Sequence, residues 1–226
     1  TGARALTSEE VEQLVADFIE AAVRAEKAGF DGVEIHGAHS YILCQFLSPT
    51  INQRTDRWGG SLENRARIIF EIIDGIRART RPGFGLGLRL SPERFGLVLA
   101  EIRGVAQQVM RDGHIDFLDM SLWDVAKEPE EADFKGRTLM SYFTELDRGS
   151  VKLGVAGKIT TAATARAMLE LGADFAIIGR AAIVHHDFPE QVRANPDFEQ
   201  KTLPVSRAYL ENEGLSPAFC NNMTNW

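Results

Sequence analysis

The chain has 226 residues, of which 44% are hydrophobic and 25% are charged, a composition typical of a folded domain that buries a large core. A formal net charge of -7 and an isoelectric point near 5.3 exclude binding to nucleic acids or anionic membranes through a bulk positive field, because both attract basic protein faces. We therefore expect a small-molecule substrate, with no nucleic acid and no membrane among the partners.

Cysteine usage and the start of the chain narrow the class further. Cys44 and Cys220 stand far apart and form no CxxC pattern, so neither a disulfide framework nor a zinc or iron–sulfur site is predicted. Redox chemistry would then need an organic cofactor. No apolar run approaches the roughly 18 residues that span a bilayer, and the start lacks a signal-peptide pattern. We expect a cytoplasmic protein that is processed, trimmed or incomplete at Thr1.

The first predicted element is an amphipathic helix over residues 7 to 28. Thr7 and Glu10 have capping-box spacing, apolar residues then recur at helical period, and Gly29 marks the stop. Directly after this helix, residues 29 to 36 have the pattern of a tight turn into a short buried strand.

Similar helix-to-strand junctions recur along the chain and predict five strands. A glycine, an aspartate and an apolar run follow a helical segment at residues 113–120 and again at 172–178. We expect strands near residues 32 to 36, 85 to 91, 116 to 121, 151 to 156 and 174 to 179. Alternating strands and helices indicate a parallel sheet, which is either an open doubly wound sheet or five units of a (β/α)₈ barrel.

The strand at 85 to 91 favours the barrel. Its alternation places Leu86, Leu88 and Leu90 on one face, and two glycines, Arg89 and Ser91 on the other. A doubly wound sheet packs apolar helices against both faces, whereas a barrel can aim small and charged side chains at a ligand in its mouth.

A cluster of hydrogen-bond donors follows the first strand, at the end where barrel enzymes place catalytic groups. His36, His39 and Tyr41 together can polarise a carbonyl and deliver a proton. The alternative is structural, with one histidine capping the strand and the tyrosine in the core. A metal site is disfavoured, because no further ligand accompanies the two histidines at a suitable spacing.

Glycine turns at the ends of the last two predicted strands indicate phosphate binding. Gly157 with Lys158 and Gly179 with Arg180 each combine a turn with a neighbouring cation, and backbone N–H groups at such turns commonly hold phosphate in barrels. A glycine in this position also simply permits a turn.

The segment GFDGVEIHGAHSYILCQFLSPTINQRTDRWGGSLENR, residues 29–65, makes the resemblance specific. It is similar to the signature of the old yellow enzyme family of FMN-dependent NAD(P)H oxidoreductases. The similarity continues through residues 87–92 and 172–180. Within the signature, residues 53–65 are expected to form a structural loop in which Ser61 caps the next helix and Asn64 takes its N3 position.

The resemblance implies a fold, an activity and residue roles. The fold is the α/β (β/α)₈ TIM barrel, with this chain carrying strands 4 to 8 as a single domain, residues 1–226. The activity is NAD(P)H-driven reduction of the C=C bond of an α,β-unsaturated carbonyl or nitro compound through bound FMN. His36 and His39 would bind the substrate oxygen, and Tyr41 would supply the proton. The phosphate predicted at Gly157 and Gly179 would belong to FMN; in the family a small or neutral residue is common where Lys158 stands, so its backbone is the expected contact.

Arg89 has two interpretations. It is either the partner of a barrel carboxylate such as Glu34 or Asp119 or, as the resemblance implies, a cation beside the N1/O2 edge of the flavin, where negative charge appears on reduction.

Several alternatives stay open on the residues alone. The chain could be a phosphate-binding lyase or isomerase with His36 or Glu34 as general base, or a non-catalytic barrel fragment. The charged segment 123–137 is either a substrate lid or a solvated excursion. Since five strands do not close a barrel, we expect a preceding segment or a partner chain to complete it. A homo-oligomer is compatible with this sequence.

Overall fold

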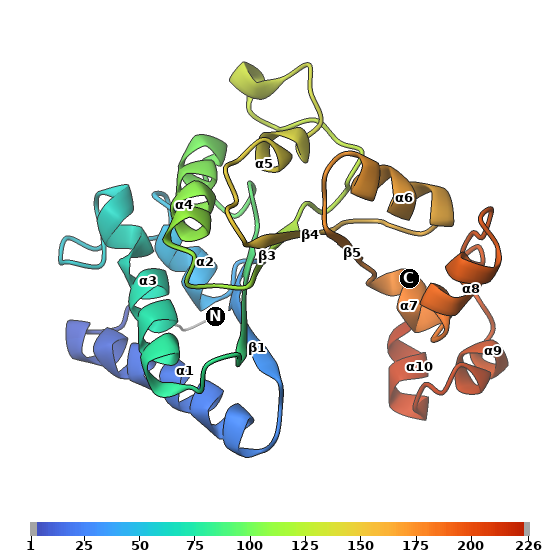
Figure 1. The fold of residues 1–226 in the computed structure, drawn as a ribbon, viewed down its shortest axis with the longest axis horizontal. Helices are drawn as coiled ribbons and strands as arrows, with labels where there is room; N and C mark the ends of the chain where they lie inside the picture. The colour runs from blue at the N-terminus through green and yellow to red at the C-terminus, as the bar shows by residue number, and fades with distance from the viewer. Residues whose placement is uncertain (1–3, 224–226) are drawn as a thin grey trace.

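The computed structural model describes residues 4–223, and its centre is a parallel sheet of five strands (Figure 1). The strands are β1 (Gly32–Gly37), β2 (Gly85–Leu90), β3 (Phe117–Ser121), β4 (Lys152–Ala156) and β5 (Phe175–Ile177). All five predicted strands are therefore present, and their ends differ from the expected ones by at most two residues.

The strand order decides between the two predicted architectures. The strands pair in chain order, β1-β2-β3-β4-β5, and every pair is parallel. Right-handed crossovers that always step in one direction place their helices on one face of the sheet, whereas a doubly wound sheet reverses direction and covers both faces. Figure 1 shows the helices along the outside of a curved sheet, so the prediction of an arc of a (β/α)₈ barrel is confirmed.

The helices surround this arc and continue beyond it. Those that begin before β5 are α1 (Ser8–Lys27), α2 (Ile42–Leu47), α3 (Leu62–Arg79), α4 (Leu99–Asp112), the 3₁₀ turn η1 (Ala132–Phe134), α5 (Ser141–Thr144) and α6 (Ala162–Glu170). Those after β5 are α7 (Arg180–Val184), α8 (Phe188–Ala194), α9 (Arg207–Asn212) and α10 (Pro217–Met223). No helix within residues 4–223 is both long and apolar enough to cross a bilayer.

Local caps explain where two of the long helices begin. The Thr7 hydroxyl accepts a hydrogen bond from the Glu10 backbone N–H at 3.2 Å, and the Glu10 carboxylate accepts one from the Thr7 N–H at 2.8 Å. At α3, the Ser61 hydroxyl accepts from the Asn64 N–H at 3.3 Å. Both caps were predicted, and both are confirmed.

The outer face of the sheet is sealed by the helices. Leu86, Leu88 and Leu90 of β2 are fully buried and belong to one core cluster with Ile69 and Ile72 of α3. The predicted alternation along this strand is therefore confirmed. Burial of these side chains removes a large apolar area from water, which stabilises the arc.

The inner face is built differently, with glycines making room for aromatic rings. A Cβ atom on Gly87 would lie 2.2 Å from the ring of Phe117, and one on Gly154 would lie 2.4 Å from the ring of Phe175. The two phenylalanine rings meet edge to face with their centroids 5.7 Å apart. They form an apolar layer inside the arc, below the strand ends.

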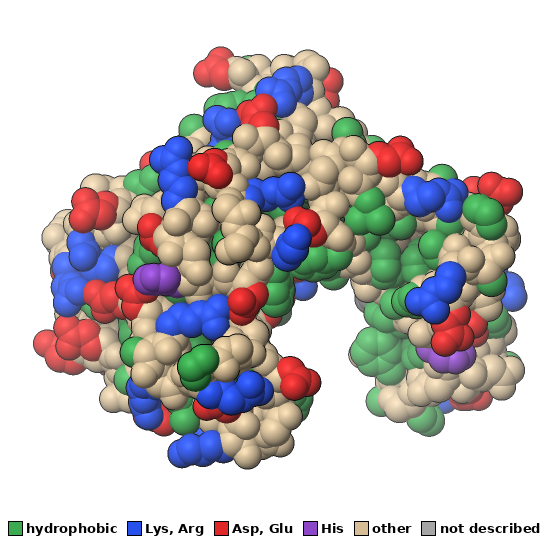
Figure 2. Space-filling model, in the orientation of Figure 1, with side chains coloured by type: hydrophobic (Ala, Val, Ile, Leu, Met, Phe, Trp, Pro, Cys, Tyr) green, Lys and Arg blue, Asp and Glu red, His purple; other side chains and the backbone are tan. Residues whose placement is uncertain are grey.

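The helices after β5 form a second, smaller core. Val184, Leu210, Cys220 and Met223 are buried together there. Figure 2 shows a wide hollow between these helices and the limb formed by β1 and α1, with hydrophobic side chains gathered on the side of α7–α10. The inner face of the arc is thus open on this side.

Candidate active site

The end of β1 holds the predicted donor cluster in an unusual backbone conformation. His36 lies on the strand, while His39 and Ser40 in the following turn have positive φ angles of 58° and 62°. The His39 backbone N–H donates to the hydroxyl of buried Ser91, 3.0 Å away, so the segment after β2 holds this turn in place. Such conformations are costly for residues other than glycine and gather at functional sites.

The structure brings the three predicted donors together. The ring centroid of His36 lies 5.2 Å from that of His39 and 5.1 Å from that of Tyr41. The histidines are partly buried, whereas 62% of the Tyr41 surface is exposed. Desolvation, followed by the positive charge of Arg89, lowers the pKa of both histidines. At neutral pH each imidazole is therefore neutral and offers one N–H donor.

Arg89 is paired within the sheet. Its Nε lies 2.9 Å from Oδ2 of Asp119 and donates to the Ser121 hydroxyl at 2.6 Å. Of the two carboxylates expected as possible partners, Asp119 is therefore the one that pairs with Arg89. Burial raises the pKa of Asp119 to about 7, although the charge of Arg89 opposes this shift.

A cavity of about 770 Å³ joins the ends of the last three strands with the donor cluster. It is lined by six of the predicted site residues, namely His39, Arg89, Gly157, Lys158, Gly179 and Arg180. His36 lies beside His39, and Tyr41 lies beside His36, but neither His36 nor Tyr41 is part of the lining. The prediction placed these residues at the strand ends, and the structure shows that most of them share one space.

Gly157 is needed for the shape of this cavity. Its φ is 152°, and a Cβ atom there would come within 2.9 Å of the Asp124 backbone nitrogen. The Val125 N–H donates to the Gly157 carbonyl at 3.1 Å, which ties the turn to the segment after β3. The Lys158 ammonium lies 3.0 Å from the Asp124 carboxylate. The lysine side chain is thus engaged with Asp124 at the rim of the cavity.

Sequence reasoning missed part of the lining. Thr160 lies between β4 and α6, and Thr164 lies in the first turn of α6. Gln200 comes from a segment far along the chain, and its backbone N–H donates to the Thr160 carbonyl at 2.9 Å. The side-chain oxygen of Gln200 is buried and has no hydrogen-bond partner within residues 4–223. No local pattern marks Gln200, because only the fold brings it to this place.

The segment 123–137 borders the same cavity through Trp123. This residue is 52% exposed, has a φ of 68° and stacks on the guanidinium of Arg94 at 4.2 Å. Further along, the Glu130 N–H donates to the buried Glu93 carboxylate at 2.7 Å. Part of the segment is therefore fastened to the loop after β2 rather than fully solvated.

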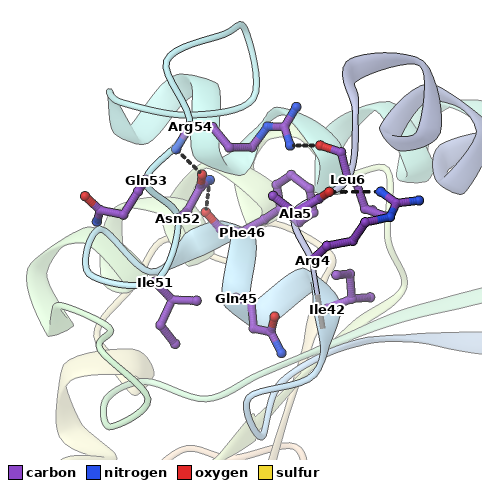
Figure 3. Close-up of a pocket in the computed structure, with 10 residues that line it drawn as sticks. All are labelled: Arg4, Ala5, Leu6, Ile42, Gln45, Phe46, Ile51, Asn52, Gln53 and Arg54. Carbon is purple, nitrogen blue, oxygen red and sulfur yellow. Dashed lines mark hydrogen bonds between the residues drawn. The ribbon is translucent and has the colours of Figure 1, made fainter. Parts of the chain in front are cut away.

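A second, shallower hollow lies between the start of the chain and α2, with a volume of about 300 Å³. Figure 3 shows its lining residues. The Arg54 side chain donates a hydrogen bond to the Leu6 carbonyl, and the Asn52 side chain donates one to the Phe46 carbonyl. Arg4 at its edge pairs with Glu10. Its cations are engaged in local structure, and it lies apart from the predicted site residues.

Comparison with known proteins fits this geometry. The model of the NADH:flavin oxidoreductase / NADH oxidase family matches residues 1–198. The chain belongs to this family. The resemblance to old yellow enzymes seen in residues 29–65 is thereby confirmed.

Individual members of the family show how far the similarity extends. The probable NADH-dependent flavin oxidoreductase YqiG of Bacillus subtilis (strain 168) is 38% identical over 208 residues, which are 89% of this chain and 56% of the relative. Putative 12-oxophytodienoate reductase 4 of Oryza sativa subsp. japonica is 53% identical over 89 residues, or 39% of this chain and 23% of that protein.

A solved structure of morphinone reductase in complex with tetrahydroNAD superposes with a TM-score of 0.73 at 29% identity. The superposition covers 95% of this chain and 59% of that chain. The chain thus spans little more than half the length of YqiG and of morphinone reductase.

Proposed function

We propose that the protein is an FMN-dependent oxidoreductase that uses NAD(P)H to reduce the C=C bond of α,β-unsaturated carbonyl or nitro compounds. The observation that carries the proposal is the shared cavity, which joins His39, Arg89 and the turns at Gly157 and Gly179. Family membership supports the flavin and the nicotinamide reductant. Similarity to the rice relative, a putative 12-oxophytodienoate reductase, supports a reductase activity of this type.

The cavity fits FMN in its size and its donors. A volume of about 770 Å³ lies within the range in which pockets enclose cofactor-sized ligands. The backbone turns at Gly157 and Gly179 offer N–H groups to a phosphate. The side-chain oxygen of Gln200, which has no hydrogen-bond partner within residues 4–223, can accept a hydrogen bond from a ligand in the cavity. Arg89 offers a cation to the pyrimidine edge of the ring system. When bound there, FMN would supply the hydride that is added to the substrate.

His36 and His39 would bind the oxygen of the activating carbonyl or nitro group. As hydride reaches the β-carbon, negative charge grows on this oxygen. Two neutral N–H donors held 5.2 Å apart by ring centroid can converge on that atom. They bind the charged transition state more strongly than the neutral substrate, which is how such donors accelerate a reaction.

Tyr41 would deliver the proton to the α-carbon. Its ring lies next to His36, and its exposed hydroxyl can exchange its proton with solvent after each turnover. Its backbone is fixed as the residue before α2, in an extended conformation. Among the proposed catalytic groups it is therefore the one that reaches furthest toward solvent.

Two more features belong to the proposal. We propose that residues 1–226 are the carboxy-terminal part of one barrel domain, and that further βα units of the same polypeptide or of a partner chain fill the hollow in Figure 2. The open inner face supports this, since eight strands close such a barrel.

The visible absorption spectrum of the purified protein, recorded before and after anaerobic addition of NADH or NADPH, tests the proposal. We expect a flavin spectrum that bleaches with the reductant and recovers when an enone or nitroalkene is added. A colourless protein that turns over a phosphorylated substrate would instead support a flavin-free lyase or isomerase. A flavin that bleaches but never recovers with any such acceptor would contradict the substrate class.

A second experiment tests the oxygen site. Phenolates imitate the charged oxygen, so replacing His36 and His39 together by alanine should weaken phenol binding while FMN stays bound. Titration of the flavin absorbance with a phenol measures this affinity. Unchanged affinity would remove the histidines from the oxygen site.

A further inference from the structure

A buried carboxylate on the inner face of the sheet has no role in the reaction described so far. Asp119 of β3 is 1% exposed, and neither of its oxygens has a hydrogen-bond partner among residues 4–223. An unsatisfied buried carboxylate costs free energy, and such groups are found where a function or a charged partner retains them.

Within residues 4–223, Asp119 forms an ion pair with Arg89 alone. The β2–β3 register places the two residues directly opposite each other, and the Oδ2–Nε distance is 2.9 Å. The Ser121 hydroxyl accepts from the same nitrogen. The contacts of the guanidinium with Asp119 and Ser121 therefore both use Nε. Its two terminal nitrogens carry four of its five donors, and Arg89 lines the cavity.

Other charged groups surround this pair. Glu34 of β1 acts electrostatically on both Asp119 and Arg89, and His36 of β1 lies opposite Arg89 in the β1–β2 register. On the other side, the residue of β4 opposite Asp119 is Gly154, which brings no charge. Asp119 is thus the carboxylate in ion-pair contact with the cation, while Glu34 and His36 act on it from the next strand.

Resting on the proposed function, we propose that Asp119 is a positioning residue that aims Arg89 at the flavin. The carboxylate holds the Nε edge of the guanidinium, so the opposite edge, with its paired N–H groups, is presented to the cavity. A long arginine side chain loses much rotamer entropy when a ligand fixes it; a carboxylate that fixes it beforehand removes this cost from flavin binding. The buried, unsatisfied state of Asp119 is the cost of this arrangement.

The experiment uses the full protein and compares four forms: wild type, Asp119→Asn, Arg89→Gln and the double variant. FMN affinity is measured by quenching of flavin fluorescence, and the reduction potential of the bound flavin is measured by dye equilibration. We expect Asp119→Asn to weaken FMN binding about fivefold to tenfold and to shift the potential. Because Asp119 acts through Arg89, the double variant should match Arg89→Gln alone in both quantities.

Glu101→Gln is the matched control. Glu101 of α4 pairs with the buried Arg65 at 2.6 Å, and neither residue lines the cavity. Its replacement removes a carboxylate from an ion pair with an arginine in the same way. FMN affinity and potential should stay at the wild-type values in this variant, while its thermal unfolding reports the structural cost.

Wild-type affinity and potential in Asp119→Asn would overturn the inference and leave the proposed function intact. Effects of Asp119→Asn that persist undiminished in the Arg89→Gln background would also overturn it, since they would show direct action on the flavin. A wild-type protein that binds no flavin would overturn the proposed function itself. If Asp119→Asn does not fold, Ser121→Ala replaces it. This change removes the other acceptor at Nε and should weaken FMN binding in the same direction but less, and an unchanged affinity would contradict the inference.

Discussion

The two faces of the parallel sheet differ in what their side chains can do. The outer face of β2 consists of three buried leucines packed into the main core, and these side chains contribute only to the stability of the fold. The inner face of the same strand carries Gly87 and Arg89, which leave room for Phe117 and place a charge at the cavity. Because successive side chains of a strand point to opposite faces, alternate residues of β2 serve the stability of the core and the chemistry of the cavity.

This separation predicts that substitutions on the two faces fail in different ways. A change on the outer face should lower the free energy of unfolding and leave the reaction unchanged in the folded fraction. A change at the strand ends or on the inner face should alter catalysis or cofactor binding before it alters stability.

The largest effect is expected at the strand end. Tyr41→Phe should slow enone reduction about 10²- to 10⁴-fold, because the proton donor is lost. Reduction of the flavin by NAD(P)H should remain nearly unchanged, since that half-reaction needs no proton from Tyr41. Stopped-flow measurement of the two half-reactions separates these steps. Equal slowing of both would make Tyr41 a packing residue.

On the outer face, Leu88→Ala should lower the free energy of unfolding by about 2 to 5 kcal/mol, because it opens a cavity in the core. Chemical denaturation measures the change. Leu169→Ala on α6 is the control, since that side chain is 46% exposed and its loss should cost little. A small loss for Leu88→Ala would show that the outer face is less tightly packed than the structure shows.

Asp119→Asn should change the pH dependence of stability. The folded chain binds the Asp119 proton more tightly than the unfolded chain, since burial raises the pKa from 3.8 to about 7. Wild-type stability therefore falls as the pH rises through this window, whereas the asparagine variant escapes the cost. We expect the variant to be more stable at pH 8 by on the order of 2 to 3 kcal/mol, with the gain vanishing near pH 4. Thermal unfolding curves at several pH values measure it, and a gain independent of pH would contradict the assignment.

Gly154→Ala tests the packing of the inner face. The new methyl group would meet the Phe175 ring at 2.4 Å, and displacing the ring should cost about 1 to 3 kcal/mol. Gly104→Ala in α4 is the control, because a Cβ atom there meets nothing closer than 4.0 Å and alanine favours the helix. A stable Gly154→Ala protein would mean that the inner ring layer is mobile.

The smallest effect is expected at the cavity rim. Lys158→Ala should change FMN affinity by less than about fivefold, because its ammonium already pairs with Asp124 in an exposed position. Lys152→Ala, at the other end of β4 and paired with Asp174, provides the comparison. A much larger loss for Lys158→Ala than for Lys152→Ala would assign the phosphate contact to the side chain rather than to the backbone.

The sequence alone was sufficient for the features that depend on neighbouring residues. The cap at Thr7, the alternation along β2 and the continuous signature at residues 29–65 each have their cause within a few positions of the chain. Five strands and their parallel direction follow from such local patterns, whereas their order came from the structure. The donor cluster at His36, His39 and Tyr41 lies within six consecutive residues, so it could be recognised without a fold.

Contacts between distant segments were decided by the tertiary structure. Asp119, rather than Glu34, pairs with Arg89 because the β2–β3 register sets them opposite each other at 2.9 Å. Gln200 is held at the cavity by a backbone hydrogen bond to Thr160, which lies forty residues away in the chain. At Gly157 both local sequence and tertiary structure contribute. The glycine turn was predictable from the sequence, whereas its close approach to the Asp124 backbone was not. Local patterns bias the backbone, but burial, register and charge pairing arise only when the strands assemble into the arc.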